Sequence, residues 1–438
     1  MESCACSTLS AGQQKKTTAF LHILISLSLI SLMAVTAQAA TTPQVSAGSS
    51  SDGSSAHTLA LKSDGTVWAW GDNTYGQLGD ATPDINTGTY ITSSAVPVQV
   101  TGLTNIKAIA AGMGFSMALD NSGTVFTWGL KDLGQLGLGD ATNRFTAVQA
   151  LTGITGIAAG AYHALALEST TSVLAWGLDA CGQLGDGVAI PSFCILSSYK
   201  VIGNAKTKPQ PIANLTGVSS VAAGSYHSLA IMSSDGSVKA WGWNSSGQLG
   251  NGATTDSSIP EAVSNLTGAT GLGAGSGHSV AFDGNHAVWA WGDNLQGQLG
   301  NGGTTNSDTP VNVLSGAAGV TAAGYYTAAW KSDGTVWTWG ENFDGQLGNG
   351  TTTPDSTTAT PTPAQVPSFS LGSAGCSATG DVNGDGVVDI FDVIKALRFA
   401  AGLDLTTASP SALANADMNC DGVIDIFDVI KVLIKASK

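Results

Sequence analysis

Short apolar runs with a period of two residues recur along most of the chain, and a glycine-rich turn follows each of them. In the unit at residues 221–252, Tyr226–Ile231 and Val238–Gly242 alternate apolar and polar residues on either side of a Ser-Asp-Gly turn. Such alternation around an Asp-Gly turn predicts a β-hairpin. Gly-Gln-Leu-Gly and a polar loop follow, and then a Pro-x-x-Val strand such as Pro310–Val313. Each unit should therefore form three or four short strands.

This unit occurs six times with constant internal spacing. In every copy a Trp-Gly pair is followed, six residues after the tryptophan, by Gly-Gln-Leu-Gly. Consecutive tryptophans lie 48 to 65 residues apart, at Trp70, Trp128, Trp176, Trp241, Trp291 and Trp339. A fixed core with loops of varying length is typical of an array of repeated units that bury their faces against one another. Small sheets packed radially in this way form a β-propeller.

The two ends of the repeat region suggest how the array closes. The first unit begins at Val45–Gly48 with no Pro-x-x-Val strand before it, whereas the last unit continues to Pro363–Val366. We therefore expect the C-terminal segment, up to about residue 370, to supply the strand that the first blade lacks. This pairing would close a ring of six blades.

Three motifs carry a resemblance to a known family. They are Ala-Ala-Gly-x-x-His-Ser-Leu-Ala at 222–230, Asp-Gly-x-Val-x-Ala-Trp-Gly at 235–242 and Gly-Gln-Leu-Gly-x-Gly at 247–252. Over about residues 44–350 the chain resembles the regulator of chromosome condensation family. The resemblance implies an all-β propeller, often of seven blades; the six repeats favour six blades here, with seven as the alternative. Guanine-nucleotide exchange, the activity of the best-known relatives, requires a nuclear or cytosolic GTPase and does not suit an exported chain.

Histidines recur at one position of the repeat. They are His57, His163, His227 and His278, and Phe115 and Thr327 stand there in the other two units. Because phenylalanine cannot bind a metal, one structural hydrogen bond per blade is a better interpretation than a ring of metal ligands. The tryptophans also occupy a fixed strand position, beside glycine, which favours packing between blades over stacking on sugars.

Aromatic residues outside these repeat positions are better candidates for contact with a ligand: Tyr75, Tyr90, Phe145, Phe193, Tyr199, Trp243 and Phe343. Two long insertions, Asp80–Ser94 and Asp186–Lys208, should project from one face, where repeat proteins commonly bind partners. The chain has no Gly-x-Ser-x-Gly, no His-Glu-x-x-His and no phosphate-binding Gly-rich loop ending in Lys-Ser/Thr. We therefore expect no enzyme, although a glycosidase pair of carboxylates in the channel stays an alternative.

The first forty residues are typical of an export signal. Lys15 and Lys16 precede an apolar run from Phe20 to Val35, and Ala-Gln-Ala at 37–39 is a small-x-small cleavage site. A membrane anchor is the alternative, because the run approaches the length of a bilayer span. After cleavage no other stretch would cross a membrane. The net charge of −15 disfavours nucleic acid and anionic lipid as partners.

Four cysteines lie beyond this leader, and an exported chain can pair them in disulfides. Three pairings are open. Proximity along the chain favours Cys181 with Cys194 and Cys376 with Cys420, and free thiols are the alternative. Zinc is disfavoured because no Cys-x-x-Cys or His cluster accompanies them.

A second duplication begins after a Thr/Pro-rich stretch at 351–363. Two twelve-residue loops, 381–392 and 417–428, carry oxygen-bearing side chains at positions 1, 3, 5, 9 and 12 and glycine at position 6. This is the pattern of an EF-hand loop, although position 12 is Asp in place of the usual Glu, and it predicts two Ca²⁺ ions. The expected ligands are Asp381, Asn383, Asp385, Asp389 and Asp392, and Asp417, Asn419, Asp421, Asp425 and Asp428.

Each loop leads into an amphipathic helical pattern, and no helical pattern precedes the first loop. Over about residues 380–436 the chain resembles a dockerin, which implies calcium-dependent binding to a cohesin. Loop positions 10 and 11 contact the cohesin and are Ser or Thr in many dockerins, but here they are Ile390, Phe391, Ile426 and Phe427. The apolar pairs point either to a different cohesin class or to packing within the module. In so small a module metal binding should be coupled to folding.

These patterns divide the chain into a signal peptide at 1–39, a propeller at 44–350 with a closing strand to about 370, a linker at 351–375 and a small all-α dockerin-like module at 377–438. The expected function is a secreted, noncatalytic binding or scaffolding protein. Its propeller would contact a protein or a glycan, and its tail would dock to a cohesin. The alternatives are an accessory or weak hydrolase in extracellular polysaccharide degradation and a propeller that inhibits another enzyme.

Overall fold

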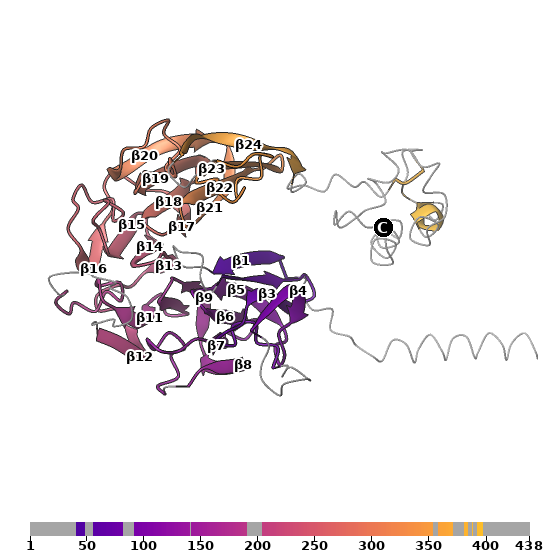
Figure 1. Cartoon of the computed structure of the whole chain (residues 1–438), viewed down its shortest axis with the longest axis horizontal. Coiled ribbons are helices and arrows are strands. Elements are labelled where there is room, and N and C mark those ends of the chain that lie inside the picture. The colour runs from indigo at the N-terminus through magenta and orange to yellow at the C-terminus, as the bar shows by residue number, and fades with distance from the viewer. Residues whose placement is uncertain are drawn as a thin grey trace, which may run out of the picture.

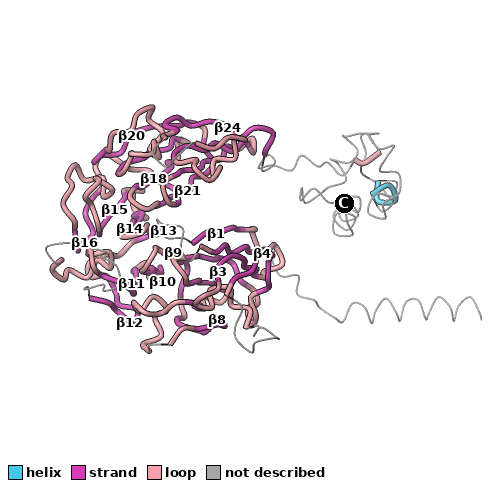
Figure 2. The backbone as a smooth tube through the Cα atoms, in the orientation of Figure 1, coloured by secondary structure: helices cyan, strands magenta, loops and turns pink. Residues whose placement is uncertain are grey.

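The computed structural model describes residues 41–48, 56–81, 92–140, 142–190, 204–353, 358–370, 381–383, 388 and 392–396. The described residues form six antiparallel sheets of four strands, and the strands of each sheet neighbour one another in chain order. The sheets follow one another around a curved array of blades (Figure 1), and strands alternate with loops along the whole array (Figure 2). The expected all-β propeller of six blades is therefore confirmed.

Within each blade the first strand is innermost and lines a central channel, and the fourth strand is the outer edge. The strands of blades one to three are β1 (Gln44–Gly48), β2 (His57–Leu61), β3 (Val67–Asp72), β4 (Ser93–Gln99), β5 (Ile106–Ala111), β6 (Phe115–Asp120), β7 (Val125–Gly129), β8 (Arg144–Leu151), β9 (Ile154–Ala159), β10 (His163–Glu168), β11 (Val173–Asp179) and β12 (Asn204–Pro211). Those of blades four to six are β13 (Val218–Ala223), β14 (His227–Met232), β15 (Val238–Gly242), β16 (Ser257–Ala262), β17 (Ala269–Ala274), β18 (His278–Asp283), β19 (Ala287–Gly292), β20 (Ser307–Ser315), β21 (Ala317–Ala323), β22 (Tyr326–Lys331), β23 (Thr335–Gly340) and β24 (Thr360–Ser370).

The glycine of each Trp-Gly pair is required by the backbone. Gly71, for example, has a φ of 107°, and a Cβ atom built there would lie 2.6 Å from the carbonyl oxygen of Ala56. A side chain would therefore be strained and would also collide with the neighbouring strand. This explains why Trp-Gly stands at or close to the end of the third strand in every blade.

Each interface between neighbouring blades has its own hydrophobic core. At five interfaces the repeat tryptophan of the later blade is fully buried, and these residues are Trp128, Trp176, Trp241, Trp291 and Trp339. Each indole Nε1 donates to the backbone carbonyl of the glutamine in the preceding blade's Gly-Gln-Leu-Gly, at 2.8–2.9 Å. The tryptophans thus join the blades, as the sequence predicts, and truncation of one to alanine should cost about 3–5 kcal/mol.

The expected closing strand is present, but it belongs to a different blade. β24 pairs with β23, with Gln365 opposite Trp337, and so it completes the sixth blade. The first blade is completed by β4, in which Pro97 lies. The closure hypothesis was wrong because each unit carries its own Pro-x-x-Val strand after Gly-Gln-Leu-Gly, so that the first blade lacks nothing. Every blade is therefore continuous in sequence, and β24 lies within the stretch expected to be a linker.

Among the described residues no helix combines the length and the apolar character that a membrane crossing requires.

Candidate functional site

The repeat histidines join neighbouring blades. His227 Nε2 lies 2.9 Å from the hydroxyl of Ser279 in the next blade, and this hydroxyl donates to the backbone carbonyl of Gln248 at 2.8 Å. The same arrangement links His57 to Ser116, His163 to Ser228 and His278 to Thr327. Burial lowers the pKa of His163 and His278 to about 3 and that of His227 to about 4. These three histidines are therefore neutral, and no cluster of three metal-binding side chains occurs among the described residues.

The assignment of Thr327 to the histidine position was wrong. In strand register Tyr326 pairs with Gly340 as His57 pairs with Gly71, so Tyr326 stands at the histidine position of blade six. The loop before β22 is one residue shorter than the others, which shifts the register by one. Thr327 instead fills the hydroxyl position and donates to Gln298 O at 2.8 Å.

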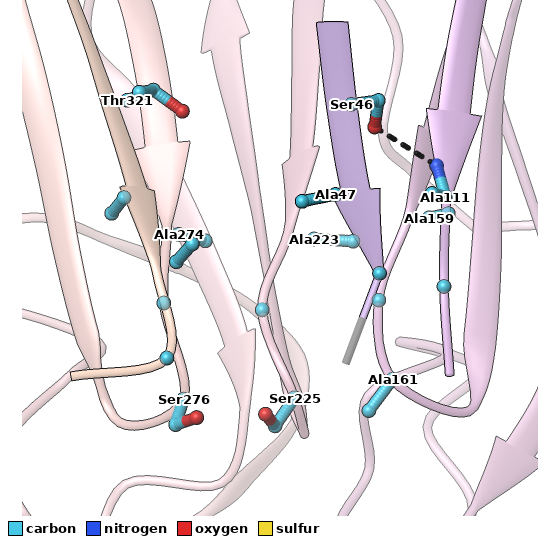
Figure 3. A pocket seen from close by; sticks show the side chains of 18 of the residues that line it. Ser46, Ala47, Ala111, Ala159, Ala161, Ala223, Ser225, Ala274, Ser276 and Thr321 are labelled. Atoms are coloured by element: carbon cyan, nitrogen blue, oxygen red, sulfur yellow. Dashed lines mark hydrogen bonds between the residues drawn. The ribbon is translucent and has the colours of Figure 1, made fainter. Parts of the chain in front are cut away.

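The described residues that line the central channel have small side chains, apart from one tyrosine. The channel has a volume of about 340 Å³ and is lined by glycine, alanine, serine, threonine and valine of the innermost strands and by Tyr326. Figure 3 shows how small these side chains are: Ser46, Ser225, Ser276 and Thr321 supply the labelled hydroxyl groups, and the remaining labelled residues are alanines. Among the described residues no carboxylate lines the channel, and the paired acids that glycoside hydrolysis requires are not found there in this part of the chain.

One face of the propeller carries a cluster of aromatic side chains. Because the strands alternate in direction, the loops between first and second strands and those between third and fourth strands lie on the same face, here called the loop face. There Tyr162 and Tyr226 stack at 5.5 Å between ring centroids, and Trp243 meets Tyr226 edge-on at 6.2 Å. We call these three half-buried residues the aromatic patch. They pack beside Leu133, Leu178 and Cys181.

The aromatic patch coincides with a change in the loops of blades two to four. In blades one, five and six an acidic residue follows Trp-Gly, and its carboxylate accepts a hydrogen bond from the glutamine side chain of Gly-Gln-Leu-Gly, as between Gln298 Nε2 and Asp293 at 2.9 Å. In blades two to four that position holds Leu130, Leu178 and Trp243.

This change leaves polar groups without partners. The amide nitrogens of Gln135, Gln183 and Gln248 are buried and have no hydrogen-bond partner among the described residues. An unpaired buried donor costs about 1–3 kcal/mol. Stability therefore does not explain the apolar residues at this position, and sequences commonly depart from local stability rules where a surface has a function.

Four of the aromatic residues expected at the surface are described. Phe343 is 47 % exposed, and Tyr75, Phe145 and Trp243 are half-buried, whereas Tyr90, Phe193 and Tyr199 lie outside the described residues. Sequence reasoning missed Tyr162 and Tyr226, since they directly precede repeat histidines and look like part of the motif. Comparison of the repeats could have found them, because other blades place Ala56, Gly114 and Gly277 there.

The third blade also carries an unusual carboxyl group beside the aromatic patch. Asp179 accepts a hydrogen bond from the backbone of Leu184 at 3.1 Å, as Asn244 does from Leu249 in blade four. Burial, together with the nearby Asp186, raises the pKa of Asp179 to about 6. Lys206 forms an ion pair with Asp186 at 3.2 Å.

Cys181 is disulfide-bonded, and its partner is not among the described residues. The other cysteines named above, Cys194, Cys376 and Cys420, lie outside them. The pairing of Cys181 with Cys194 and that of Cys376 with Cys420 therefore stay predictions.

Part of the first expected calcium loop is described. The backbone N–H of Asn383 donates to Asp392 Oδ1 at 2.8 Å, which joins loop position 3 to position 12. Asp392 is fully buried and begins a helical turn at 392–396, together with buried Val393 and Ala396. Carboxylate and amide oxygens are the ligands that a hard cation such as Ca²⁺ takes, so the donor types present here fit that ion. Asp381 is also described, whereas Asp385, Asp389, the ligands of the second loop and the apolar positions Ile390, Phe391, Ile426 and Phe427 lie outside the described residues.

Comparison with known families matches both parts of the chain. The RCC1-like domain matches residues 31–380, and the dockerin type I domain matches residues 379–435. Among solved structures, Prp20p from Saccharomyces cerevisiae has a TM-score of 0.59 at 22% identity over 74% of this chain and 76% of that one. Human WBSCR16 has a TM-score of 0.52 at 21% identity over 61% of this chain and 67% of that one. At these identities the likeness concerns the fold.

Curated relatives match about half of the chain. The human probable E3 ubiquitin-protein ligase HERC3 is 30% identical over 211 residues, which are 47% of this chain and 18% of that protein. The human E3 ubiquitin-protein ligase HERC2 is 29% identical over 233 residues, which are 52% of this chain and 3% of that protein. The chain thus spans less than a fifth of the length of these relatives.

Proposed function

Because this chain belongs to the RCC1-like family and carries a match to the dockerin type I domain, we propose that it is a secreted binding protein that attaches to an extracellular assembly. The propeller binds a partner on its loop face, and the tail binds a cohesin in the presence of calcium. The proposed division of the chain is a leader at 1–39, a propeller at 44–350 completed by β24, a linker and a dockerin at 377–438.

The aromatic patch is the observation that carries the proposal for the propeller. Aromatic side chains at half-exposed positions supply much contact area at low entropic cost and are enriched at binding surfaces. The apolar residues at the neighbouring repeat position leave three buried amide nitrogens without a hydrogen-bond partner among the described residues. The channel, by contrast, is lined mostly by small side chains, and no carboxylate or histidine is found among its described lining residues. These features support a binding role over a hydrolytic one.

Export and calcium binding are supported separately. The leader pattern and the disulfide of Cys181 suit an oxidising compartment. The fold of the described calcium-loop residues around Asp392 suits a cation in the first loop, and the sequence of the second loop implies a second Ca²⁺ ion. The ligase activity in the names of the HERC proteins concerns whole proteins of which this chain matches 3–18%, and the proposal does not include it.

Two binding experiments on the full chain test the two halves of the proposal. Surface plasmon resonance with type I and type II cohesins, with calcium and with a chelator, tests the tail. Calcium-dependent binding is expected, and its absence for every cohesin would remove the docking role and leave the tail as a folding module.

For the propeller, secreted and surface fractions of the source cells and a panel of soluble glycans would be offered to the immobilised chain. Trp243→Asp should abolish capture without unfolding the blade, because blades one and five carry Asp72 and Asp293 at the same repeat position. Phe343→Asp, on the loop face but outside the aromatic patch, is the matched control and should leave capture unchanged. Loss of capture in both variants or in neither would contradict the assignment of the site, and capture of a glycan would favour the polysaccharide-accessory reading.

A further inference from the structure

The boundary between blades four and five brings an aromatic ring and a carboxylate together on the loop face. Trp243 belongs to the aromatic patch, and Asp293 holds the same repeat position in the next blade. The backbone N–H of Asp293 donates to the carbonyl of Gly277 at 2.8 Å. A Cβ atom built at Gly277 would lie 3.6 Å from Trp243 Cζ3 and 3.9 Å from Asp293 Oδ2. The indole and the carboxylate therefore flank the same glycine.

The absence of a side chain at Gly277 allows these two groups to lie so close. Even a Cβ atom there would be 3.3 Å from Asp293 Cβ. A larger side chain would compete for the space that Trp243 and Asp293 occupy. Three other blades carry a tyrosine at this repeat position, and these residues are Tyr162, Tyr226 and Tyr325. Blade five thus combines a glycine here with an aromatic residue of one blade and an acid of the next.

The negative charge of Asp293 is not balanced within the described part of the chain. Its Oδ2 accepts a hydrogen bond from Gln298 Nε2 at 2.9 Å, and its Oδ1 accepts only a long one from the Leu295 N–H at 3.4 Å. No lysine or arginine among the described residues forms an ion pair with it, and burial raises its pKa. In the next blade burial, together with Asp344, raises the pKa of Glu341. A positive charge from outside would stabilise both carboxylates in their ionised form.

An indole beside an unbalanced carboxylate matches the two parts of a basic side chain. The methylene stem of lysine or arginine packs on apolar surface, and its charged end is attracted both to the face of an aromatic ring and to a carboxylate. A neutral sugar can stack on the ring but supplies no charge, and an anionic sugar is repelled by the carboxylates. The net charge of −15 acts in the same direction, because it attracts a basic partner.

We propose that the loop face binds a partner protein through a lysine or arginine side chain that lies on Trp243 and pairs with Asp293. This inference rests on the binding role proposed for the aromatic patch and specifies the chemistry of the partner. Apolar residues beside the basic residue of the partner cover Tyr226 and Leu178. The recognised feature is therefore a basic residue within an apolar segment, and not a sugar.

Fluorescent peptides test this contact on the full chain in the presence of calcium. Each peptide carries a central lysine, arginine, acetyl-lysine or glutamate between leucine and phenylalanine residues, and fluorescence anisotropy measures its dissociation constant. The lysine and arginine peptides should bind about tenfold or more tightly than the other two. Asp293→Asn should remove this preference, because asparagine still accepts the Gln298 hydrogen bond but carries no charge. Trp243→Leu, which copies the residue of blades two and three, should weaken the lysine and arginine peptides about fivefold.

Asp72→Asn is the matched control, because Asp72 accepts the same glutamine hydrogen bond in blade one, away from the aromatic patch. It should change the dissociation constants by less than about twofold in physiological salt. Equal losses in Asp72→Asn and Asp293→Asn would show that only the overall charge attracts the peptides and would overturn the contact. So would lysine and arginine peptides that bind no better than the acetyl-lysine peptide, or no binding by any peptide. If a secreted protein or a neutral glycan is captured through Trp243 and equally by Asp293→Asn, the aromatic patch remains a binding site and only the basic contact is wrong.

Discussion

Replacement of Asp179 by asparagine should stabilise the propeller, and the gain should depend on pH. Burial raises the pKa of Asp179 to about 6, with Asp186 adding to the effect. Asparagine at 179 can still accept the hydrogen bond of Leu184, as Asn244 accepts that of Leu249. The Nδ2 group of asparagine would donate a hydrogen bond to Asp186, whereas the carboxyl group of Asp179 can donate one only when it is protonated. Four other blades already use asparagine here, at Asn73, Asn244, Asn294 and Asn342.

The sign of the pH dependence follows from proton linkage. The folded chain holds its proton on Asp179 more tightly than the unfolded chain, whose pKa is 3.8. The favourable contribution is therefore complete below pH 3.8 and is lost as the pH rises through about 6. A difference of about two pKa units corresponds to roughly 3 kcal/mol at neutral pH. Because Lys206 offsets part of the local negative charge, we expect Asp179→Asn to raise the free energy of unfolding by about 1–3 kcal/mol at pH 7.5.

Urea unfolding of both proteins at fixed calcium between pH 4 and pH 8 measures this difference. The gain should be small at pH 4 and grow until about pH 7. Asp120→Asn is the control of opposite sign, because hydrogen bonds from Ser122 and Thr124 lower the pKa of Asp120 despite its partial burial. That variant should lose stability at pH 7.5 and approach the parent as the pH falls. A gain for Asp179→Asn that is equal at pH 4 and pH 8, or a loss at pH 8, would refute the reasoning.

Three further predictions concern the interfaces and the tail. Gly250→Ala should cost more than about 3 kcal/mol of unfolding free energy, and Gly268→Ala only about 1 kcal/mol. Both glycines have positive φ, but a Cβ atom at 250 would lie 2.7 Å from the Trp291 indole, whereas one at 268 would meet nothing within 4 Å. Equal unfolding midpoints of the two variants would contradict this prediction. Ser279→Ala should cost about 1–3 kcal/mol by leaving the buried Nε2 of His227 unpaired and by removing one of the two hydrogen bonds to the Gln248 carbonyl, which still accepts from Trp291. Adding His227→Phe should recover part of that loss, as in the natural pair of Phe115 and Ala164. A double-mutant cycle in which the two effects merely add would refute the pairing. Removal of calcium should abolish the helical circular dichroism of the tail and leave the β-sheet signal of the propeller, and an unchanged helical signal would contradict the coupling of metal binding to folding.

The repeat could be predicted from sequence because its invariant residues are required by the backbone and by packing. Trp-Gly marks a glycine of positive φ in every blade and a buried indole in blades two to six. The closing strand and the position of Thr327 could not be predicted in the same way. The blade that the closing strand completes depends on where the repeat unit is taken to begin. The position of Thr327 depends on the loop before β22, which is one residue shorter than its counterparts, as the pairing of Tyr326 with Gly340 reveals. The aromatic patch could not be predicted for a related reason, since Tyr162 and Tyr226 lie inside a repeated motif whose pattern indicates a structural role.

The departures from the repeat gather on the loop face of blades two to four. Leu130, Leu178 and Trp243 replace the residue that elsewhere pairs with a glutamine, and each replacement leaves a buried amide nitrogen unpaired. Asp179 replaces asparagine in the same region at the cost of a raised pKa. Random loss of stability would scatter such changes over all six blades. Their concentration around the aromatic patch is expected if one side of the loop face is adapted to a partner. Blades one, five and six keep the form of the loop in which an acidic residue pairs with the glutamine side chain.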